Sequence, residues 1–299
     1  MKKWIFIFCA TIVSQHLNAQ PFNAPKILII TAHPDDETGF AATTYKITKE
    51  LHGIADQCVI TNGEGGYKYA TLSESFYGLE LTDEAVGREH LPRIRKQELL
   101  NAAKIIGIRN VFFLDQKDAH YGLDEREPLD TTWNVNWVST RLKEIITRTK
   151  YDYVFCLLPT PETHAHHKAA TLLAIRTILT LPSNQRPIIL GVTGASKEDT
   201  IKLNYTQLKN YTETKIEGNG PLYSFDKSVQ FGYKNSLSYK IIVNWEIAEH
   251  KSQGTMQLAM NHGDYEQFWY FSMNGEEGKI KCQKLFEELK SIPYKLKTY

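Results

Sequence analysis

The sequence predicts an α/β protein with a Rossmann-like, three-layer fold, in which a mostly parallel sheet carries helices on both faces. Short continuous apolar runs, which are typical of strands buried on both faces, alternate with longer segments of helical composition. The connections between these segments are short, as in chains that fold into parallel sheets. No internal repeat or low-complexity linker interrupts the pattern. These three observations favour one α/β domain.

The individual elements follow from the same pattern. The expected strands are residues 26–31, 54–61, 111–114, 151–158 and 187–192. The expected helices are residues 38–51, 91–106, 134–149 and 164–179. We expect residues 67–90, which are polar and aromatic, to form a long excursion. From about residue 196 the pattern loosens, and the aromatic segments 223–225 and 268–271 are expected to be edge strands or a lid.

The composition excludes some classes of function. Hydrophobic residues make up 42% of the 299 residues and charged residues 23%, as in ordinary globular proteins. The 35 Lys and Arg residues nearly balance the 34 Asp and Glu residues, leaving a formal charge of +1. This balance gives no sign of a surface for nucleic acid or an anionic membrane. A neutral or small polar substrate fits the composition better than a polyanion.

The N-terminus has the order of features found in signal peptides. Lys2 and Lys3 precede an apolar run at residues 4–13, and Ala19 supplies a small residue for cleavage before Gln20. We therefore expect a signal peptide at residues 1–19, one domain at residues 20–299 with a less regular C-terminal part, and a secreted or periplasmic protein. A buried N-terminal helix is the alternative. No later stretch approaches the length of a transmembrane span.

Two clusters of metal-binding residue types directly follow expected strands. The segment AHPDDE at residues 32–37 follows the first strand, and ETHAHH at residues 162–167 follows the fourth. In such folds ligands bind at the carboxyl ends of strands, so the clusters converge if these strands are neighbours. Zinc prefers nitrogen and oxygen ligands, and a spare carboxylate and imidazole can serve as base and acid. This inventory suits metal-assisted hydrolysis.

Simpler explanations exist for each cluster. Asp35 or Asp36 can be the N-cap of a helix in a solvated acidic turn, and the histidines can be a helix start without function. Both explanations would have to hold at matched strand ends, which makes them less economical. No C-x-x-C pair occurs, which disfavours a cysteine-rich zinc site. Cys58 and Cys156 lie in strand-like runs, and we expect them to be buried.

The segment AHPDDE resembles the signature of the PIG-L/LmbE family of zinc-dependent N-acetylglucosaminyl deacetylases. Four further segments match the family in the same order, over about residues 26–253: TNGEGG at residues 61–66 resembles its glycine loop, RKQEL at residues 95–99 its R-x-x-E-L helix, HAHH at residues 164–167 its H-x-D-H motif, and AEHKSQ at residues 248–253 a late A-x-x-H-x-S-Q segment.

The resemblance implies roles for residues of the two clusters. His33, Asp36 and His167 would bind Zn²⁺ or another divalent transition metal. Asp35 would be the general base that takes a proton from the attacking water. His164 would protonate the departing amine or help to hold the tetrahedral intermediate.

The resemblance also implies substrate contacts. Arg95 matches a family arginine that contacts sugar hydroxyls, although it can equally be a surface residue, and Asp118 is a second contact on a looser match. His166 stands where the family often has Asp or Asn, and it cannot supply a negative charge to His164. We therefore expect a lower pKa for His164, with Glu162 as a possible replacement carboxylate.

The function implied by the resemblance is removal of an acetyl group from an N-acetylglucosamine-type sugar or glycoconjugate, with no nucleic-acid partner. One alternative is a zinc amidase or esterase that acts on another acyl group. A second is a secreted sugar-binding protein with a degenerate site, against which the presence of all three ligands counts. A nucleotide-binding protein is a third, but residues 62–66 lack the spacing of phosphate-binding glycine loops.

Overall fold

The computed structural model describes residues 24–199 and 202–291, so the expected signal peptide at residues 1–19 lies outside the described residues. The strands are β1 (Lys26–Thr31), β2 (Ile54–Thr61), β3 (Ile108–Gln116), β4 (Tyr153–Leu157), β5 (Ile188–Ala195), β6 (Tyr223–Asp226), β7 (Gln230–Phe231), β8 (Leu237–Ser238) and β9 (Tyr265–Tyr270). The α-helices are α1 (Ala41–Tyr45), α2 (Glu74–Tyr77), α3 (Glu84–Ile106), α4 (Val135–Thr149), α5 (Ala165–Leu179), α6 (Lys240–Glu249), α7 (Gly254–Gln257) and α8 (Gly275–Ser291).

The main sheet has seven strands in the order β3-β2-β1-β4-β5-β9-β6. The five neighbouring strands β3, β2, β1, β4 and β5 run parallel to one another. The strand β9 runs antiparallel to both of its neighbours, β5 and β6. The strands β7 and β8 form a separate two-stranded sheet. The predicted α/β class with a mostly parallel sheet is confirmed.

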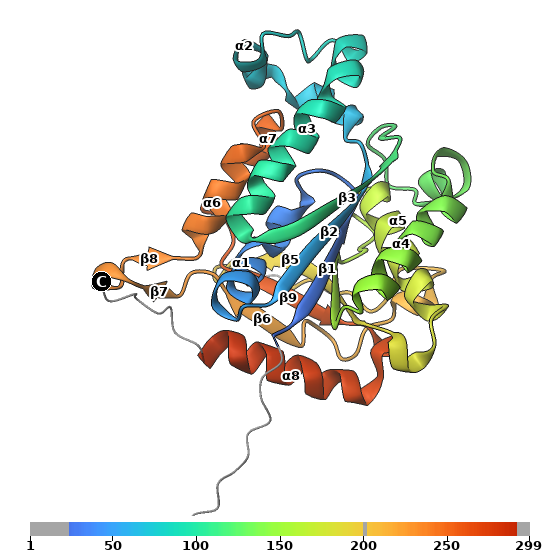
Figure 1. The fold of residues 1–299 in the computed structure, drawn as a ribbon, viewed down its shortest axis with the longest axis vertical. Coiled ribbons are helices and arrows are strands. Elements are labelled where there is room, and N and C mark those ends of the chain that lie inside the picture. Colours follow the sequence, from blue (N-terminus) through green and yellow to red (C-terminus); the bar gives the residue numbers. More distant parts are fainter. Residues whose placement is uncertain (1–23, 200–201, 292–299) are drawn as a thin grey trace, which may run out of the picture.

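Helices cover both faces of this sheet. Alternate residues of β1 pack against the helices on opposite faces. Ile27 and Ile29 pack on the core formed with α1, α3, α6 and α8. Leu28 and Ile30 pack on the opposite core, formed with α4 and α5. Because successive side chains of a strand point to opposite faces, an unbroken apolar run is what a strand between two helical layers requires. Figure 1 shows α4 and α5 on one side of the sheet and α1, α3 and α6 on the other.

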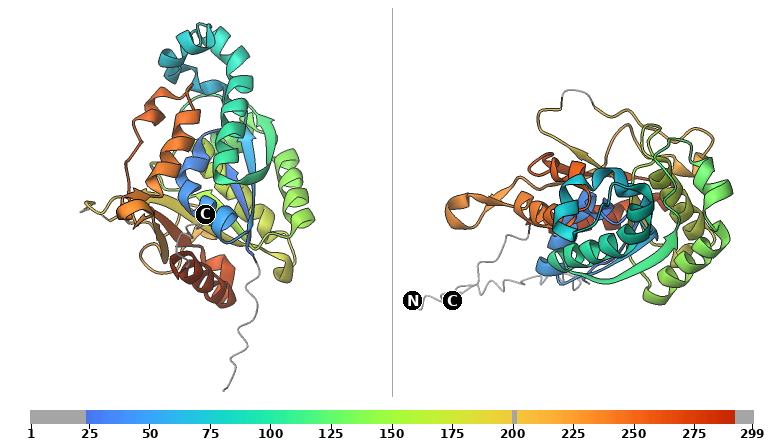
Figure 2. Two further views of the ribbon diagram at one scale, coloured as in Figure 1. Left: turned by 60° about the vertical axis from the view of Figure 1, so that its left-hand side comes forward. Right: turned by 90° about the horizontal axis from the view of Figure 1, so that it is seen from above.

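The predicted elements are present, with two differences of physical interest. The helix expected from residue 91 begins at Glu84, because Asp83 caps it by accepting the backbone N–H groups of Ala85 and Val86, each at 3.0 Å. Its first turns are largely exposed and polar, so hydrophobic periodicity could not reveal them. Residues 62–83 form short helical turns that project beyond the carboxyl ends of the strands (Figure 2).

The second difference concerns the aromatic segment 268–271. It belongs to β9, which is an interior strand between β5 and β6 and not an edge strand. Phe268 and Tyr270 join one core, whereas Trp269 and Phe271 join the other, so this segment is buried on both faces. The segment 223–225 does form the edge strand β6. No helix within residues 24–199 and 202–291 has the length and apolar character needed to cross a bilayer.

Candidate active site and metal centre

The two histidine-containing clusters meet at one end of the sheet. β1 and β4 are parallel neighbours, with Ile27 opposite Tyr153 and Ile29 opposite Phe155, which is the condition for the two clusters to converge. The chain proceeds from β1 towards β2 and β3 on one side, and from β4 towards β5 on the other. The crevice at such a switch in strand order is where open α/β sheets bind their ligands. The loops after β1 and β4 therefore hold the candidate site.

The three predicted ligands, His33, Asp36 and His167, lie together here, and we call them the ligand cluster. His33 Nδ1 lies 3.0 Å from His167 Nε2, and the same His167 atom lies 3.0 Å from Asp36 Oδ1. His33 Nδ1 is 3.7 Å from Asp36 Oδ2. Ligand atoms bound at about 2.0–2.2 Å around one tetrahedral zinc ion lie about 3.3–3.6 Å apart. The cluster thus has the donor types and the spacing of a metal site.

Local backbone structure fixes these side chains. Asp36 Oδ2 accepts the backbone N–H groups of Ala32 at 3.0 Å and His33 at 2.8 Å, which closes the loop that leaves β1. His164 is the N-cap residue of α5, and His167 lies in the first turn of that helix. Residues three apart on a helix share a face, so His164 and His167 both point to the cavity.

The electrostatics of the ligand cluster favour a positive charge. Burial lowers the pKa of His33, but the carboxylates of Asp118 and Asp36 outweigh it and raise that pKa to about 10. Burial would raise the pKa of Asp36, yet His167 and His33 hold it well below its usual range. A divalent cation supplies the positive charge that these buried carboxylates call for. The residues present therefore fit a metal ion.

Asp35, the predicted base, lies beside the ligand cluster and lines the cavity. Burial raises the pKa of its carboxyl group, and the nearby charge of Arg95 opposes that rise. Arg95 Nη2 lies 3.1 Å from Asp35 Oδ1 and donates at 3.1 Å to the carbonyl oxygen of Pro34. Arg95 Nη1 donates at 2.8 Å to the carbonyl oxygen of Gly63. Arg95 is thus a buried residue that holds Asp35, and its contact with a sugar stays a prediction.

His164 is packed between two aromatic systems. Its ring stacks on those of Tyr121 and His33, with centroids 4.9 Å and 5.2 Å away. Its Nε2 lies 3.2 Å from the carbonyl oxygen of His120, so we place the Nε2 proton there. Burial, and then the charges of neighbouring histidines, lower the pKa of His164 to about 3, in the expected direction. Ring nitrogens of His33, His164 and His167 lie within 4.8 Å of one another.

The place of the absent motif carboxylate is not taken by Glu162, which is exposed. Two other carboxylates lie beside the buried His166. Asp118 Oδ1 is 3.3 Å from His166 Nδ1, and Glu127 Oε2 is 3.8 Å from His166 Nε2. Asp118 is buried among the histidines, and its role as a sugar contact also stays a prediction.

The glycine loop after β2 makes room for this arrangement. A Cβ atom on Gly63, whose φ is +74°, would lie 2.8 Å from Arg95 Nη1. A Cβ atom on Gly65 would lie 2.8 Å from Asp118 Oδ1, and the backbone N–H of Gly65 donates to Asp118 Oδ2 at 3.1 Å. The glycines are therefore required for the close approach of Arg95 and Asp118.

A cavity of about 320 Å³ opens above these residues. That volume lies at the lower end of the range of small-molecule sites, about 300–1,000 Å³. Tyr67, Tyr69 and Tyr121 also line it. Sequence reasoning missed several lining residues, among them Arg88 and His120. Neither stands in a recognisable motif, so no sequence signal could have identified them.

A second buried charged group lies behind the motif, and we call it the acid cluster: Glu37, Glu246, His250 and Glu266. His250 Nε2 lies 2.5 Å from Glu37 Oε1, and both side chains are fully buried. Glu266 accepts the backbone N–H groups of Ala42 and Thr43, each at 2.8 Å. Glu246 is fully buried, and neither of its carboxylate oxygens has a hydrogen-bond partner among the residues that the structure describes. The charges of Glu37 and Glu266 act on Glu246, so the four groups share one environment.

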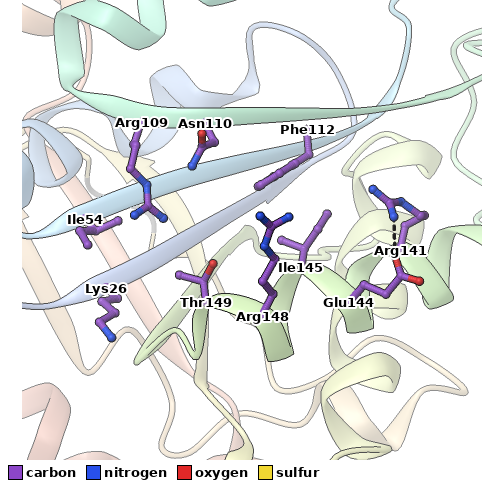
Figure 3. Close-up of a pocket in the computed structure, with 10 residues that line it drawn as sticks. All are labelled: Lys26, Ile54, Arg109, Asn110, Phe112, Arg141, Glu144, Ile145, Arg148 and Thr149. Atoms are coloured by element: carbon purple, nitrogen blue, oxygen red, sulfur yellow. Dashed lines mark hydrogen bonds and ion pairs between the residues drawn. The ribbon is translucent and has the colours of Figure 1, made fainter.

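A larger cavity, of about 550 Å³, lies at the opposite ends of the strands (Figure 3). Its cationic residues are Lys26, Arg109, Arg141 and Arg148. Arg109 is paired with the buried carboxylate of Asp56, and Arg141 with Glu144. None of the predicted site residues lines this cavity, so its size does not make it the candidate active site.

Comparison with known proteins decides the family. The model of the PIG-L family, described as GlcNAc-PI de-N-acetylase, matches residues 28–178, which is half of the chain. The chain belongs to the PIG-L family. The prediction that this chain is a deacetylase is thereby confirmed. PIG-L deacetylases are metal-dependent, which agrees with the groups of histidine and aspartate side chains described above.

The individual relatives share low sequence identity with this chain. The chain is 24% identical over 175 residues to a probable N-acetyl-alpha-D-glucosaminyl L-malate deacetylase 2 of Bacillus cereus, covering 58% of this chain and 70% of the relative. The corresponding Bacillus subtilis protein is 25% identical over 174 residues, with the same coverage. The N,N'-diacetylchitobiose deacetylase from Pyrococcus horikoshii superposes with a TM-score of 0.45 at 17% identity, covering 90% of this chain and 81% of that structure.

Proposed function

We propose that this PIG-L deacetylase uses a zinc ion to remove the acetyl group from an N-acetylglucosamine-type sugar or glycoconjugate, and that it acts outside the cytoplasm. The observation that carries the proposal is the ligand cluster beside Asp35. Two imidazoles and a carboxylate face one another at 3.0–3.7 Å, with a further carboxylate next to them on the wall of a cavity. Metal-assisted amide hydrolysis requires this combination of groups.

His33, Asp36 and His167 are the residues that would hold the ion. When bound, the ion would polarise the acetyl carbonyl group and lower the pKa of a water molecule towards ~7. Proton transfer and the orientation of the reacting groups are carried out by side chains of this chain. The donor set of nitrogens and an oxygen is compatible with zinc, and also with other divalent transition metals.

Asp35 is placed to take a proton from the attacking water. The Arg95 guanidinium fixes the position of its Oδ1. A carboxylate whose pKa is raised by burial is a stronger base than an exposed one, which suits proton abstraction near neutral pH. Asp35 thus activates the nucleophile, while Arg95 orients the base.

His164 lines the same cavity as Asp35 and is the group that would complete the reaction. Its lowered pKa keeps the imidazole neutral in the free protein. It must therefore gain its proton during the reaction, and Asp35 is the group that has one to pass on. The amine nitrogen then receives a proton as the C–N bond breaks, and acetate leaves. Once protonated, His164 can alternatively donate a hydrogen bond to the tetrahedral intermediate.

A sugar ring suits the cavity. Its wall combines the phenol ring of Tyr121, which stacks on His164, with polar groups such as Arg88. Apolar ring faces together with a few placed hydrogen-bond donors are the usual lining of small-molecule sites. Action outside the cytoplasm rests on the charged start, apolar run and small residue within residues 1–19. An extracellular glycan or cell-envelope substrate fits such export.

The proposal is tested by elemental analysis of the purified protein together with an acetate-release screen. The screen compares N-acetylglucosamine and its oligomers with O-acetylated sugars and with amides of longer acyl groups. We expect bound zinc and acetate release from N-acetylated sugars. Faster cleavage of esters or longer amides would assign the site to another acyl substrate. Binding of N-acetylglucosamine without acetate release would indicate a sugar-binding protein.

A further inference from the structure

We propose that His33 Nε2, His166 Nδ1 and Asp118 Oδ1 form a second, internal site for a divalent transition-metal ion, on the side of the His33 ring that faces away from the ligand cluster. The proposal goes beyond the deacetylase function, but it rests on it in one respect, because the two sites share His33. The ligand cluster uses His33 Nδ1, which leaves His33 Nε2 for the internal site.

The three atoms have the spacing of ligands around one ion. His33 Nε2 lies 3.2 Å from His166 Nδ1 and 3.6 Å from Asp118 Oδ1, and the last two atoms are 3.3 Å apart. A tetrahedral zinc ion bound at about 2.0–2.1 Å separates its ligand atoms by about 3.3–3.4 Å. The three separations are close to that value. Two imidazoles and a carboxylate are also a common ligand set for such ions.

Hydrogen bonds alone explain this spacing less well. A charge-assisted bond between an imidazole and a carboxylate is about 2.7–2.9 Å long. Asp118 Oδ1 is 3.3 Å and 3.6 Å from its two imidazole neighbours, and the second distance is too long for a hydrogen bond. The three side chains surround a common centre instead of pairing closely.

The orientation of His166 also favours a ligand. Its ring is fully buried, and its Nε2 has no hydrogen-bond partner among the described residues. Glu127 Oε2 is 3.8 Å from that nitrogen. A proton on Nε2 would face this carboxylate, which leaves the lone pair of Nδ1 directed at His33 and Asp118. Ligating histidines usually turn their other ring nitrogen towards a carboxylate, a backbone carbonyl or water, and Glu127 lies on that side of His166, beyond hydrogen-bond distance.

Charge balance makes a buried ion tolerable at this position. Asp118 is nine-tenths buried or more and supplies one negative charge. Once His33 holds the first ion through Nδ1, its one remaining ring proton is on Nε2, and binding of the second ion there would release that proton to solvent as H⁺ and leave a bridging imidazolate. The two negative charges offset those of the second ion, which reduces the cost of burying it.

The test counts ions in the whole protein. Metal-stripped protein is reloaded with Zn²⁺, freed of excess ions by gel filtration, and analysed by inductively coupled plasma mass spectrometry. We expect two zinc ions per chain in the wild type and one in His166→Asn, which retains the ligand cluster. Titration with Co²⁺ should show two phases in the visible spectrum of the wild type, and only the first in His166→Asn. His262→Asn, at an exposed histidine, is the matched control and should hold two ions.

Other counts would overturn the proposal. A wild-type protein that holds one ion and releases acetate lacks the internal site but keeps the proposed function. Two ions in both the wild type and His166→Asn would place the second ion elsewhere. A protein that holds no ion overturns both proposals. Anomalous scattering at the zinc edge from wild-type crystals needs no substitution, and should show one peak on each side of the His33 ring.

Discussion

The ligand cluster and the acid cluster are both buried groups of charged side chains, but they compensate charge in different ways. In the ligand cluster, Asp36 faces two imidazoles, and its pKa is held well below the usual range. In the acid cluster, burial and the charges of Glu37 and Glu266 raise the pKa of Glu246 well above its usual range. Asp36 of the ligand cluster stays ionised, so a bound cation would be stabilised there. Glu246 of the acid cluster takes up a proton, which lowers the negative charge of that cluster.

This difference follows from position in the fold. The ligand cluster lies at strand ends beneath a cavity, where an ion and a substrate can enter. The acid cluster joins the helical turn after β1 to β9 and to α6 with its C-terminal His250, and Glu246 is fully buried there. A buried carboxylate that lacks a partner is most stable as the neutral acid. The comparison therefore predicts opposite effects for substitutions in the two clusters.

The largest effect is expected for His33→Ala. This change removes the imidazole that joins the ligand cluster to Asp118 and His166, so the protein should lose its metal. Turnover should fall by about 10³-fold or more, because a catalytic metal contributes several kcal/mol to the transition state. Elemental analysis and an acetate-release assay measure the two losses. Glu246→Gln, in the acid cluster, is the control and should keep its metal. A His33→Ala protein with full metal content would contradict the ligand assignment.

The next largest effect is expected for Asp35→Asn. Asn cannot accept the proton of the attacking water, so kcat should fall by about 10²–10⁴-fold. Metal content should stay at the wild-type value, because Asp35 is not among the three predicted ligands. Turnover at the native rate in this variant would show that another group acts as the base.

A smaller effect is expected for Arg95→Gln. The charge of Arg95 lowers the pKa of Asp35, so its loss should raise that pKa. Asp35 acts as a base only when deprotonated, and the acidic limb of the kcat/KM profile should therefore move to higher pH. Arg88→Gln is the control, because Arg88 donates to the carbonyl oxygens of Asp118 and Ala119 and not to Asp35. An unchanged acidic limb in Arg95→Gln would argue against Asp35 as the titrating base.

The smallest effect is expected for Glu246→Gln, and it concerns stability. The folded-state pKa of Glu246 is raised above its unfolded value, so its neutral form stabilises the fold at low pH and this contribution is lost as pH rises through the folded-state pKa. Gln removes that dependence. At pH 8 the variant should be more stable by about 1 kcal/mol, or about 2–4 °C in Tm, and near pH 4 the difference should vanish.

Thermal unfolding followed by circular dichroism at the two pH values measures this effect. The matched variant is Glu266→Gln, at the other carboxylate of the acid cluster. Glu266 accepts hydrogen bonds from Ala42 and Thr43, so this variant should be less stable than the wild type at both pH values. A loss of stability in Glu246→Gln at pH 8 would show that the ionised form of Glu246 is needed.

The sequence by itself determined the parallel part of the sheet and the residues of the ligand cluster. β1 is an unbroken apolar run and AHPDDE follows it at once, so both the strand and the position of His33 and Asp36 depend on local sequence. The fourth strand and the histidine segment are equally contiguous. Because parallel strands present their carboxyl ends at one edge, the two segments had to meet once their strands were neighbours.

Only the tertiary structure decided what surrounds these residues. Glu37 and His250 are 213 positions apart, and the carboxylate partners of His166 come from the segment after β3, so no local pattern could pair them. The place of β9 inside the sheet was also hidden, because an aromatic run fits either an exposed lid or a strand buried on both faces. Local sequence sets which groups are available for chemistry. Long-range packing sets which of them share a buried environment, and so which keep their charge.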